Sequence, residues 1–466
     1  MKFFIVSSFG CGVGVWKLLS GDPRHSAVVH IGQSKGGPLI SHRYVGEGIV
    51  PKEDSWRAFR EEAVMFAQNV NGAIAVFDSS GLGDYAEELI KAGVPTLGGG
   101  KFMDKLEKER DFSMDMMNNN GCSIPDYQCF DSLTATIQHV WHNRHKGLIV
   151  NGKVVEKVYF KTNAYIDSDA TRSADNPEDL IRFLRHVRAR TPDKRLNMLQ
   201  EAIDGPDIST GRWWNGKAWV GPYLGTIEKK KLLAGEIGPA TGCALNAVWW
   251  YQTPEPLIAK ALNWENLTGA FRHNNAPPGW YDINAILKDG KAWFLEWTPR
   301  FGWDSEGTSL PLLYENLPDW FNYIATGQST GNLNLSSKIA YAVRLGVPPY
   351  PWEDCKRDAN GSAVGVGVWG EPVQKLSGET GFVGYQLKAS NFKKEWKIAC
   401  AEAMVGLACG TGTKISEIHA EVMETIKKIK TSSAFVYRSD GDDAVCEQAE
   451  RAAEEGFTDL PKGLTQ

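Results

Sequence analysis

Apolar runs and amphipathic segments alternate over the first 98 residues, and this alternation restricts that region to few possible folds. The apolar runs are KFFIVSS, SAVVHIG, AIAVF and VPTLGG. Between the second and third runs, Trp56, Phe59, Ala63 and Phe66 recur every three or four residues, which indicates a helix with one apolar face. Strands that alternate with helices pair in parallel through crossover connections. We therefore predict a small parallel-sheet domain over residues 1–98.

The segment FGCGVGVWKLL follows the first predicted strand and turns into a helix. The backbone N–H groups of Gly10, Gly12 and Gly14 could hold an anion at the start of that helix. The glycine spacing differs from G-x-G-x-x-G, and AVVHIGQSK offers no acid at the end of the second strand to bind a ribose. These features disfavour a dinucleotide-binding dehydrogenase.

The size and composition of the chain exclude several classes of protein. A chain of 466 residues is too long for one ordinary core, so several domains are expected. The net charge of −5 gives no reason to expect a nucleic-acid partner. The eight cysteines form no C-x-x-C pair, which indicates free thiols in a reducing compartment. Without a signal peptide or a run of about 18 apolar residues, we expect a cytoplasmic protein that does not enter membranes.

The stretch GWYDINAILKDGKAWFLEWTPR, residues 279–300, has the pattern of a β-hairpin that turns at KDG. A two-residue Asp-Gly loop would place Asp282 opposite Trp297. A three-residue loop with a left-handed Gly290 would place Asp282 opposite Glu296 instead, and we take this register as the prediction.

The predicted register brings four oxygen-bearing side chains to one face of an apolar hairpin. They are Asp282, Asn284, Glu296 and Thr298. Hard cations such as Mg²⁺ take oxygen ligands of this kind, usually one or two carboxylates with phosphate oxygens and water. Alternatively, Glu296 is structural and pairs with Arg300 or another base. The hairpin by itself leaves both interpretations open.

Five stretches outside and within this hairpin follow one another in a recognisable order. They are GVPTLGGGKFMDKLEKERDFSMDMMNNNGCSIPDYQCF, LQEAIDGPDIS, KKKLLAGEIGPATG, LEWTPRFGWDSEG and GLACGTGTKISEIHAEVMETIKKIKTSSAFVYRSDGD. In this order they resemble the ATP-grasp ligases, especially phosphoribosylamine–glycine ligase. They are similar, in turn, to that family's entry into the ATP-binding domain, its adenine-side hinge, its substrate-side loop, its acidic strand with an Arg-Phe-Gly turn, and its C-terminal domain. The likeness runs over residues 1 to about 441.

The resemblance implies the fold class α/β with α+β parts. An ATP-grasp fold would be preceded by a small Rossmann-like domain and followed by a small β/α domain. The implied boundaries are 1–98 for the first domain, 99–332 for the ATP-grasp domain with a mobile subdomain at about 122–198, 333–441 for the C-terminal ligase domain and 442–466 for an acidic tail.

The resemblance also implies a reaction. A carboxylate attacks the γ-phosphate of ATP to form an acylphosphate, and an amine then displaces phosphate to give an amide. Asp282, Glu296 and Thr298 would hold Mg²⁺ or Mn²⁺. Arg300 would grip the substrate carboxylate or the acylphosphate, and Lys161 matches the family's phosphate-binding lysine. Outside this context, Lys161 would be taken for a solvated surface lysine.

Further positions match the family's nucleotide and substrate sites. Arg110 stands where the family usually has a second lysine, and Asp207 replaces a glutamate expected on the ribose hydroxyls. The other predicted nucleotide contacts are Lys161, Gln200, Glu201 and Ile203, and the predicted substrate contacts are Gly10, Gly12, Gly14, Gly238, Thr241, Gly242 and Arg300. Taken alone, Arg110 belongs to the charge run KLEKER of a solvated helix, and GPATG is an ordinary loop.

Three departures from the family pattern bear on the substrate. The first glycine-rich loop lacks the family's Arg-Glu-His run, and Thr298 takes the place of a metal-binding asparagine. The segment TNAYIDSDATRSADNPEDL has no glycine where the family has a glycine-rich flap over the phosphates. We therefore predict a carboxylate–amine ligase, monomeric or homodimeric, that joins glycine or another small amino acid to an amine other than, or related to, phosphoribosylamine. The alternative is a catalytically silent paralogue that binds a nucleotide or an anion.

Overall fold

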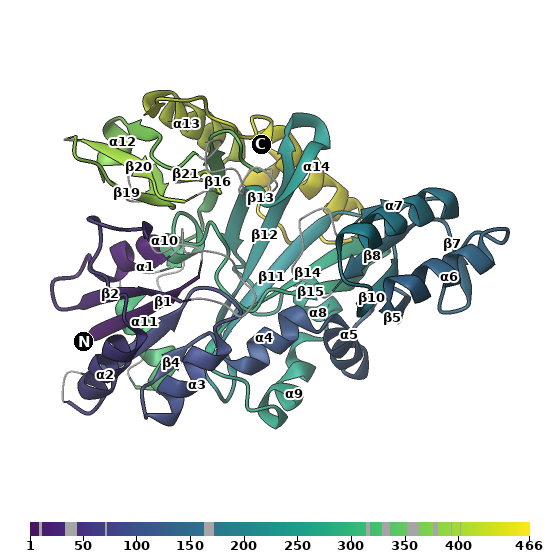
Figure 1. Ribbon diagram of the computed structural model, residues 1–466, viewed down its shortest axis with the longest axis horizontal. Helices are drawn as coiled ribbons and strands as arrows, with labels where there is room; N and C mark the ends of the chain where they lie inside the picture. The colour runs from purple at the N-terminus through teal and green to yellow at the C-terminus, as the bar shows by residue number, and fades with distance from the viewer. Residues whose placement is uncertain are drawn as a thin grey trace.

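The structure is a computed structural model that describes residues 1–8, 12–32, 44–69, 72–162, 172–313, 317–328, 336–351, 363–375, 381–392, 394–400 and 402–466. One end of the molecule holds a parallel sheet, the opposite end holds a small projecting sheet, and a large antiparallel sheet lies between them (Figure 1). The predicted fold class, α/β with α+β parts, is confirmed. The exact domain boundaries stay a prediction.

The N-terminal sheet has the strand order β2-β1-β3-β4, and all three strand pairs are parallel. Its elements are β1 (Lys2–Ser7), α1 (Gly12–Leu19), β2 (Ser26–Ile31), α2 (Trp56–Ala67), β3 (Ala73–Phe77), α3 (Gly83–Lys91) and β4 (Thr96–Leu97). Alternate residues of β1 enter different cores: Phe4 packs with Phe59 and Leu89, whereas Phe3 and Ile5 face the rest of the protein. Burial on both faces explains the continuous apolar run.

The projecting sheet has the order β5-β10-β8-β9. Its elements are β5 (Tyr127–Ser132), α6 (Leu133–Asn143), β8 (Val158–Thr162), β9 (Arg172–Ala174), α7 (Pro177–Arg190) and β10 (Lys194–Glu201), with the short hairpin β6 (Leu148–Val150) and β7 (Lys153–Val155) beside them. Helices α6 and α7 cover one face, where Phe160 and Leu199 are buried. Lys161 and Gln200 therefore point from the opposite face, because neighbouring strand residues alternate.

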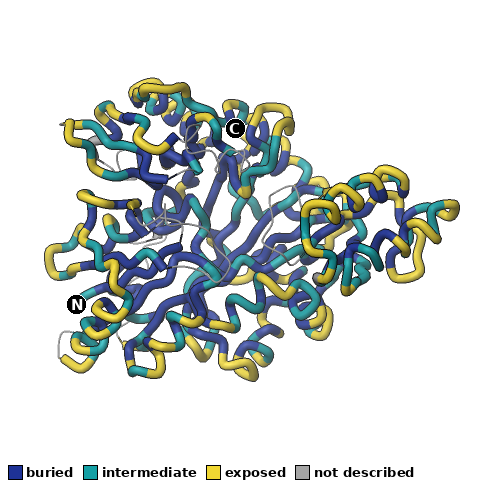
Figure 2. The backbone as a smooth tube through the Cα atoms, in the orientation of Figure 1, coloured by how far each residue is buried: buried dark blue, intermediate teal, exposed yellow. Residues whose placement is uncertain are grey.

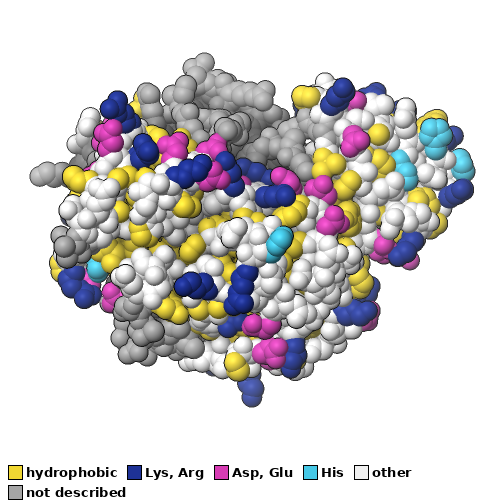
Figure 3. Space-filling model, turned by 90° about the horizontal axis from the view of Figure 1, so that it is seen from below, with side chains coloured by type: hydrophobic (Ala, Val, Ile, Leu, Met, Phe, Trp, Pro, Cys, Tyr) yellow, Lys and Arg dark blue, Asp and Glu magenta, His cyan; other side chains and the backbone are white. Residues whose placement is uncertain are grey.

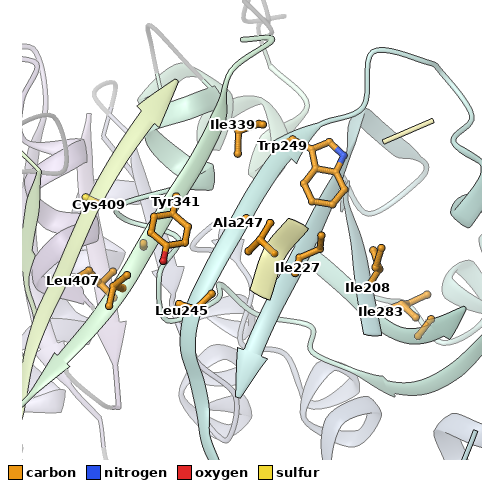
Figure 4. Packing of buried hydrophobic residues seen from close by; sticks show 14 of the residues in the cluster. Ile208, Ile227, Leu245, Ala247, Trp249, Ile283, Ile339, Tyr341, Leu407 and Cys409 are labelled. Carbon is orange, nitrogen blue, oxygen red and sulfur yellow. The ribbon is translucent and has the colours of Figure 1, made fainter. Parts of the chain in front are cut away.

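The large sheet has the strand order β15-β14-β11-β12-β13-β16-β21-β18. Its strands are β11 (Asp207–Trp214), β12 (Trp219–Leu233), β13 (Ile237–Trp250), β14 (Gly279–Lys288), β15 (Lys291–Trp297), β16 (Ile339–Gly346), β18 (Phe382–Gly384) and β21 (Met404–Gly412). One face carries the main core, to which Ile208, Ile227, Ala247 and Ile283 belong (Figure 4). The residues between them must point the other way, which gives the sheet a second, more polar face.

The hairpin β14–β15 corrects the predicted register. Asp289 and Gly290 form a two-residue loop, both with positive φ (51° and 71°), so Leu287 pairs with Ala292. The three-residue loop was therefore the wrong choice. A β-bulge at Leu295 then restores the facing, because Asn284 pairs with Glu296 while Ala285 pairs with Phe294.

The bulge explains why an acid lies on this apolar strand. Ala292 and Phe294 are fully buried in the main core, and strict alternation would send Glu296 after them. The extra residue instead turns Trp297 into the core and Glu296 to the polar face. Thr298 follows on the same face, where its hydroxyl donates a hydrogen bond to Asp282 Oδ2 at 3.0 Å.

The remaining helices pack around the sheets. They are α4 (Lys101–Lys108), α5 (Arg110–Asn119), α8 (Leu257–Ala261), α9 (Leu267–His273), α10 (Ser309–Leu313), α11 (Leu317–Thr326), α12 (Glu371–Lys375), α13 (Ile415–Lys428) and α14 (Gly441–Glu454). A further sheet, β19-β20-β17-β22, joins β17 (Gly367–Trp369), β19 (Leu387–Ala389), β20 (Glu395–Ile398) and β22 (Lys430–Thr431). Burial is continuous through the sheets and falls off at the outer helices and turns (Figure 2).

The C-terminal segment differs from its prediction in two respects. AFVYRSD, residues 434–440, has the apolar and aromatic composition that predicts a strand, but it forms only an isolated bridge between Val436 and Gly346. Residues 442–466, predicted to be an acidic surface segment, instead pack against the main core, where Val445 and Leu464 are fully buried. Helix α14 buries Ala444, Ala449 and Ala452 and turns most of its acidic residues towards solvent, so the acidic composition concealed an apolar face.

The surface carries positive and negative side chains in mixed order on the face seen from below (Figure 3). Among the described residues, no helix combines the length and apolar character needed to span a bilayer. The six cysteines in the described ranges are free thiols.

Candidate active site

A pocket of about 240 Å³ lies on the polar face of the large sheet. Strands β11 to β15 form its floor, and the segment after β15 forms a wall. The polar floor residues are Ser209, Thr226, Glu228, Lys230, Asn246, Asp282, Asn284 and Glu296, and the polar wall residues are Thr298, Arg300, Asp304, Ser305, Thr308 and Ser309. The four hairpin residues singled out in the sequence therefore share one pocket.

Strand register assembles this floor. Glu296 pairs with Asn284, Asn284 with Ser209, and Ser209 with Thr226, so one row of polar residues crosses four strands. The Ser209 hydroxyl donates a hydrogen bond to Asn284 Oδ1 at 2.5 Å. Gly211 pairs with Asp282 in the adjacent row. A Cβ at Gly211 would lie 2.7 Å from Asp282 Oδ1, so only glycine fits beside this carboxylate.

Glu296 forms an ion pair with Arg110, whose Nη1 lies 2.8 Å from Glu296 Oε2. Glu109 separates helices α4 and α5 with non-helical torsions (φ −97°, ψ 84°), which places Arg110 at the first turn of α5. Burial by itself would raise the pKa of Glu296, but the charges of Arg110, Lys230 and Lys161 outweigh it and hold the pKa well below the usual range. Glu296 is therefore ionised, and the predicted pairing with a base occurs with Arg110.

Lys161 reaches the same group of charges from the projecting sheet. Only 7% of the residue is exposed. Burial lowers the pKa of Lys161 to about 7, and the positive charge of Arg110 adds to this shift while Glu296 opposes it. Lys161 taken in isolation would be expected in solvent, so its burial beside Glu296 agrees with the functional interpretation that the resemblance implied.

Asp282 has the opposite shift. Burial raises the pKa of Asp282 to about 7 even though the Thr298 hydroxyl donates a hydrogen bond to it, and the charge of Glu228 adds to the rise. The pKa values of the two acids on this hairpin are thus shifted in opposite directions. Cations surround Glu296, whereas Asp282 lies near other acids.

Lys230 belongs to this site but was not predicted. Its Nζ lies 3.5 Å from Asp207 Oδ2, 3.7 Å from Glu228 Oε2 and 4.0 Å from Glu296 Oε1. The Asp207 carboxylate raises the pKa of Lys230 above its usual range although burial opposes this. Thr226, Glu228 and Lys230 stand at every second position of β12, and this polar alternation within an apolar strand was the available signal.

The predicted nucleotide contacts on β10 and after it lie between the two sheets. Gln200 is 1% exposed, and its side-chain Oε1 and Nε2 meet no hydrogen-bond partner. A buried amide without partners is costly, so this pair of atoms suits a ligand edge that offers both a donor and an acceptor. Glu201 and Ile203 are half-buried beside it, and Asp207 begins β11.

Arg300 lines the pocket, but its guanidinium already contacts an acid. Arg300 Nε and Nη2 lie 3.1 Å and 3.0 Å from Glu107 Oε1. A substrate carboxylate would therefore have to bind the guanidinium together with Glu107. The predicted contact between Arg300 and the substrate stays a prediction.

The structure separates the predicted substrate-side residues. Gly242 lines the pocket, whereas Gly238 is exposed and lies outside its lining. The Thr241 hydroxyl donates to the Lys230 carbonyl at 3.0 Å, so it braces β12 against β13. Asp304 was missed: its Oδ2 accepts hydrogen bonds from Asn246 Nδ2 and the Thr308 hydroxyl, both at 2.7 Å.

The described part of the glycine-rich loop does not line this pocket. Gly10 lies outside the described residues, as do residues 163–171 of the predicted flap. Gly12 N–H donates to Ser7 Oγ at 3.2 Å, and a Cβ at Gly14 would lie 2.6 Å from Glu306 Cγ. These two glycines permit close packing, so the described part of the loop gives no support to the predicted anion cradle.

The residues fit the groups that the resemblance implies. No three His, Cys, Asp or Glu side chains cluster for a metal within the ranges that the structure describes. A divalent ion would therefore depend on the carboxylates of Asp282 and Glu296 with oxygens from Thr298, phosphates and water, which is the ligand set that Mg²⁺ prefers. The unpartnered Gln200 amide and the cations Arg110, Lys161 and Lys230 suit a base and its phosphates.

Solved structures of ligases share this architecture. The chain is similar to phosphoribosylamine–glycine ligase from Thermotoga maritima, with 16% identity, a TM-score of 0.66, and 94% of this chain and 100% of that chain covered. It is also similar to the biotin carboxylase–β,γ-ATP complex from Campylobacter jejuni (10% identity, TM-score 0.57, 98% and 95% covered). A third is the biotin carboxylase domain of 2-oxoglutarate carboxylase from Hydrogenobacter thermophilus, in complex with MgADP and bicarbonate (11%, 0.57, 99% and 95%).

The sequence itself matches no model of a protein family and no curated protein. The structural likeness establishes the fold: the chain has the ATP-grasp fold that the sequence motifs predicted, with a parallel-sheet domain before it and a further β-sheet after it.

Proposed function

We propose that this protein is an ATP-dependent carboxylate–amine ligase that forms an amide through an acylphosphate. The observation that supports it most is one cluster of charges drawn from five elements. Arg110, Lys161, Asp207, Lys230 and Glu296 meet between the two sheets of an ATP-grasp fold. Cations that face phosphate and acids that face a divalent ion are what phosphoryl transfer requires.

The residues divide the work by their chemistry. Arg110, Lys161 and Lys230 would bind phosphate oxygens of ATP, and Gln200 with the backbone near Ile203 would meet the base. Mg²⁺ or Mn²⁺, held by Asp282, Glu296 and Thr298, would supply neutralisation of the phosphate charge. Arg300 would orient the carboxylate that attacks the γ-phosphate, and the resulting acylphosphate loses phosphate when the amine adds to its carbonyl carbon.

The substrates are expected to differ from those named for the structural neighbours. The Arg-Glu-His run is absent, and Gly12 and Gly14 serve packing. Glycine or another small amino acid is our proposed carboxylate, and the protein would act as a monomer or homodimer. Phosphate release from ATP across a panel of amino acids and amines tests the proposal. Release that requires one such pair supports a ligase, whereas ATP binding without release from any pair identifies a silent nucleotide-binding paralogue.

Binding of ATP with Mg²⁺ is expected to be strongest near pH 7. Below pH 7 Asp282 is protonated in the free protein and cannot ligate a metal, and above pH 7 Lys161 loses the proton that attracts phosphate. Affinity should fall by up to about tenfold per pH unit on either side. Lys161→Arg keeps its charge and should remove the alkaline decline. Calorimetric titration from about pH 5.5 to 8.5 measures this; a flat profile would contradict the assignment of both groups.

A further inference from the structure

Arg344 is a buried arginine whose bonding capacity is mostly unused. It lies on β16, and 4% of the residue is exposed. Its Nη1 donates to the Thr241 carbonyl at 2.8 Å. Its Nε and Nη2 have no hydrogen-bond partner of normal geometry, the neutral Tyr350 hydroxyl lies beside the guanidinium, and no acid in the described part of the chain forms an ion pair with it.

Arg438, the other buried arginine in the described residues, and the half-buried Arg300 are both paired with acids. Arg438 binds Asp440 and Glu236 through Nε and Nη2, and Arg300 binds Glu107 through the same two nitrogens. A guanidinium cannot lose its charge in a protein, and a buried charge without a counterion is expensive. The exception at Arg344 therefore calls for an anion that the described residues do not supply.

The unpartnered atoms define the shape of that anion. Nε and Nη2 lie on one edge of the guanidinium and present two N–H donors side by side, which matches the two oxygens of a carboxylate or phosphate. The Thr241 carbonyl holds the opposite side of the group, and Cζ lies 4.8 Å from the centre of the Trp303 ring. The fork is thus fixed in orientation before any ligand arrives.

Arg344 lies behind the residues that line one end of the pocket and is not itself part of the lining. Ala342 pairs with Asn246 and Ala340 with Val248, so even-numbered residues of β16 share the face that lines the pocket. Trp303 and Gly242 line the same end. Gly242 has φ +79° and nothing within 4 Å of where a Cβ would be, so the space next to this residue, which follows the Thr241 that anchors Arg344, is open.

We propose that Arg344 binds a carboxylate on the amine substrate, so that the acceptor is an amino acid or a similar amino-carboxylate. The inference rests on the proposed ligase function. A monoanion balances the single charge of Arg344, whereas a phosphate dianion would bring excess negative charge towards the acids Asp304 and Glu228, which line the same pocket.

This carboxylate is not the one that reacts with ATP. Four strand spacings of about 4.8 Å separate β14, which carries Asp282, from β16. The fork of Arg344 is therefore too distant from the proposed metal site to hold the attacking carboxylate. It can hold the far end of a second substrate whose amine points back along the pocket.

The test compares alanine, ethylamine and O-phosphoethanolamine as acceptors, with glycine and ATP, in the wild type, Arg344→Met and Arg344→Lys. Wild type should favour alanine over ethylamine by about 10- to 100-fold in kcat/KM, the value of a bidentate charged pair. Arg344→Met should abolish this preference by raising the KM of alanine. Arg344→Lys, which keeps the charge but not the fork, should retain part of it. Arg451→Gln, an exposed arginine outside the pocket, is the control.

Three results would overturn the proposal: an alanine preference unchanged in Arg344→Met, an equal loss with ethylamine and alanine, or O-phosphoethanolamine as the best acceptor. If no pair supports phosphate release, the ligase function fails, but the site remains testable by thermal unfolding. Saturating alanine should then raise the unfolding midpoint of wild type and not of Arg344→Met. The same shift in both proteins would refute the site without bearing on the ligase.

Discussion

Glu296→Gln is expected to reduce ATP-dependent phosphate release by at least about 100-fold, because it removes a metal ligand and the carboxylate that organises three cations. The substitution keeps the shape of the side chain and leaves Arg110 without its partner. We expect a loss of stability of about 2 kcal/mol, below the cost for fully buried pairs, because the two side chains retain 24% and 30% exposure. Phosphate release and urea unfolding measure the two effects.

Glu61→Gln provides a matched control. Glu61 also forms a 2.8 Å ion pair with an arginine, Arg57, but both side chains are largely exposed at 60% and 86%. This variant should retain full phosphate release and unfold within about 0.5 kcal/mol of wild type. If Glu296→Gln kept wild-type release, Glu296 would be structural, and the pairing with Arg110 would be its whole role.

Lys161→Met should weaken ATP binding by about 100-fold while leaving the free protein as stable as wild type or more stable. In the free protein the buried ammonium is opposed by Arg110, so methionine removes a cost. In the complex the ammonium meets phosphate, and methionine removes that gain. Isothermal titration of ATP and thermal unfolding together separate this from simple misfolding, which would lower both.

The sign of the pH effect on stability gives a second check on Lys161. The pKa of Lys161 in the folded protein, about 7, lies below the 10.5 of an unperturbed lysine, so the unfolded chain binds more protons between these pH values. Unfolding free energy should therefore rise with pH across this window in wild type, relative to Lys161→Met. Lys157→Met, at an exposed position on the same segment, should change neither ATP affinity nor this slope. Equal slopes in wild type and Lys161→Met would show that Lys161 is not buried as a cation.

The hairpin shows what the sequence could and could not predict. An acid on an apolar strand indicated a site, and Asp-Gly indicated a tight turn. The register failed because only the loop length was considered and no bulge, although a two-residue loop with one bulge turns Glu296 to the same face as a three-residue loop does. Phe294 and Trp297 both enter the core three residues apart, and that spacing was a sign of the bulge at Leu295.

Contacts between segments that are distant in the chain could not be predicted from the sequence. Gly14 is small because Glu306 packs against it, and no local pattern connects the two positions. Lys230 could have been found by its alternation with Glu228, but its partners depend on strand pairing. The lack of hydrogen-bond partners at Arg344 Nε and Nη2 could not be seen in the sequence, because it depends on which residues surround the side chain in the folded protein.

Binding of Mn²⁺ in the presence of ATP, followed by electron paramagnetic resonance, tests most directly whether the two acids of the hairpin seat a metal–nucleotide complex. We expect one tightly bound Mn²⁺ per chain when ATP is present, and loss of that binding in an Asp282→Asn, Glu296→Gln double variant that still unfolds cooperatively. Equal Mn²⁺ binding by wild type and the double variant would contradict the account.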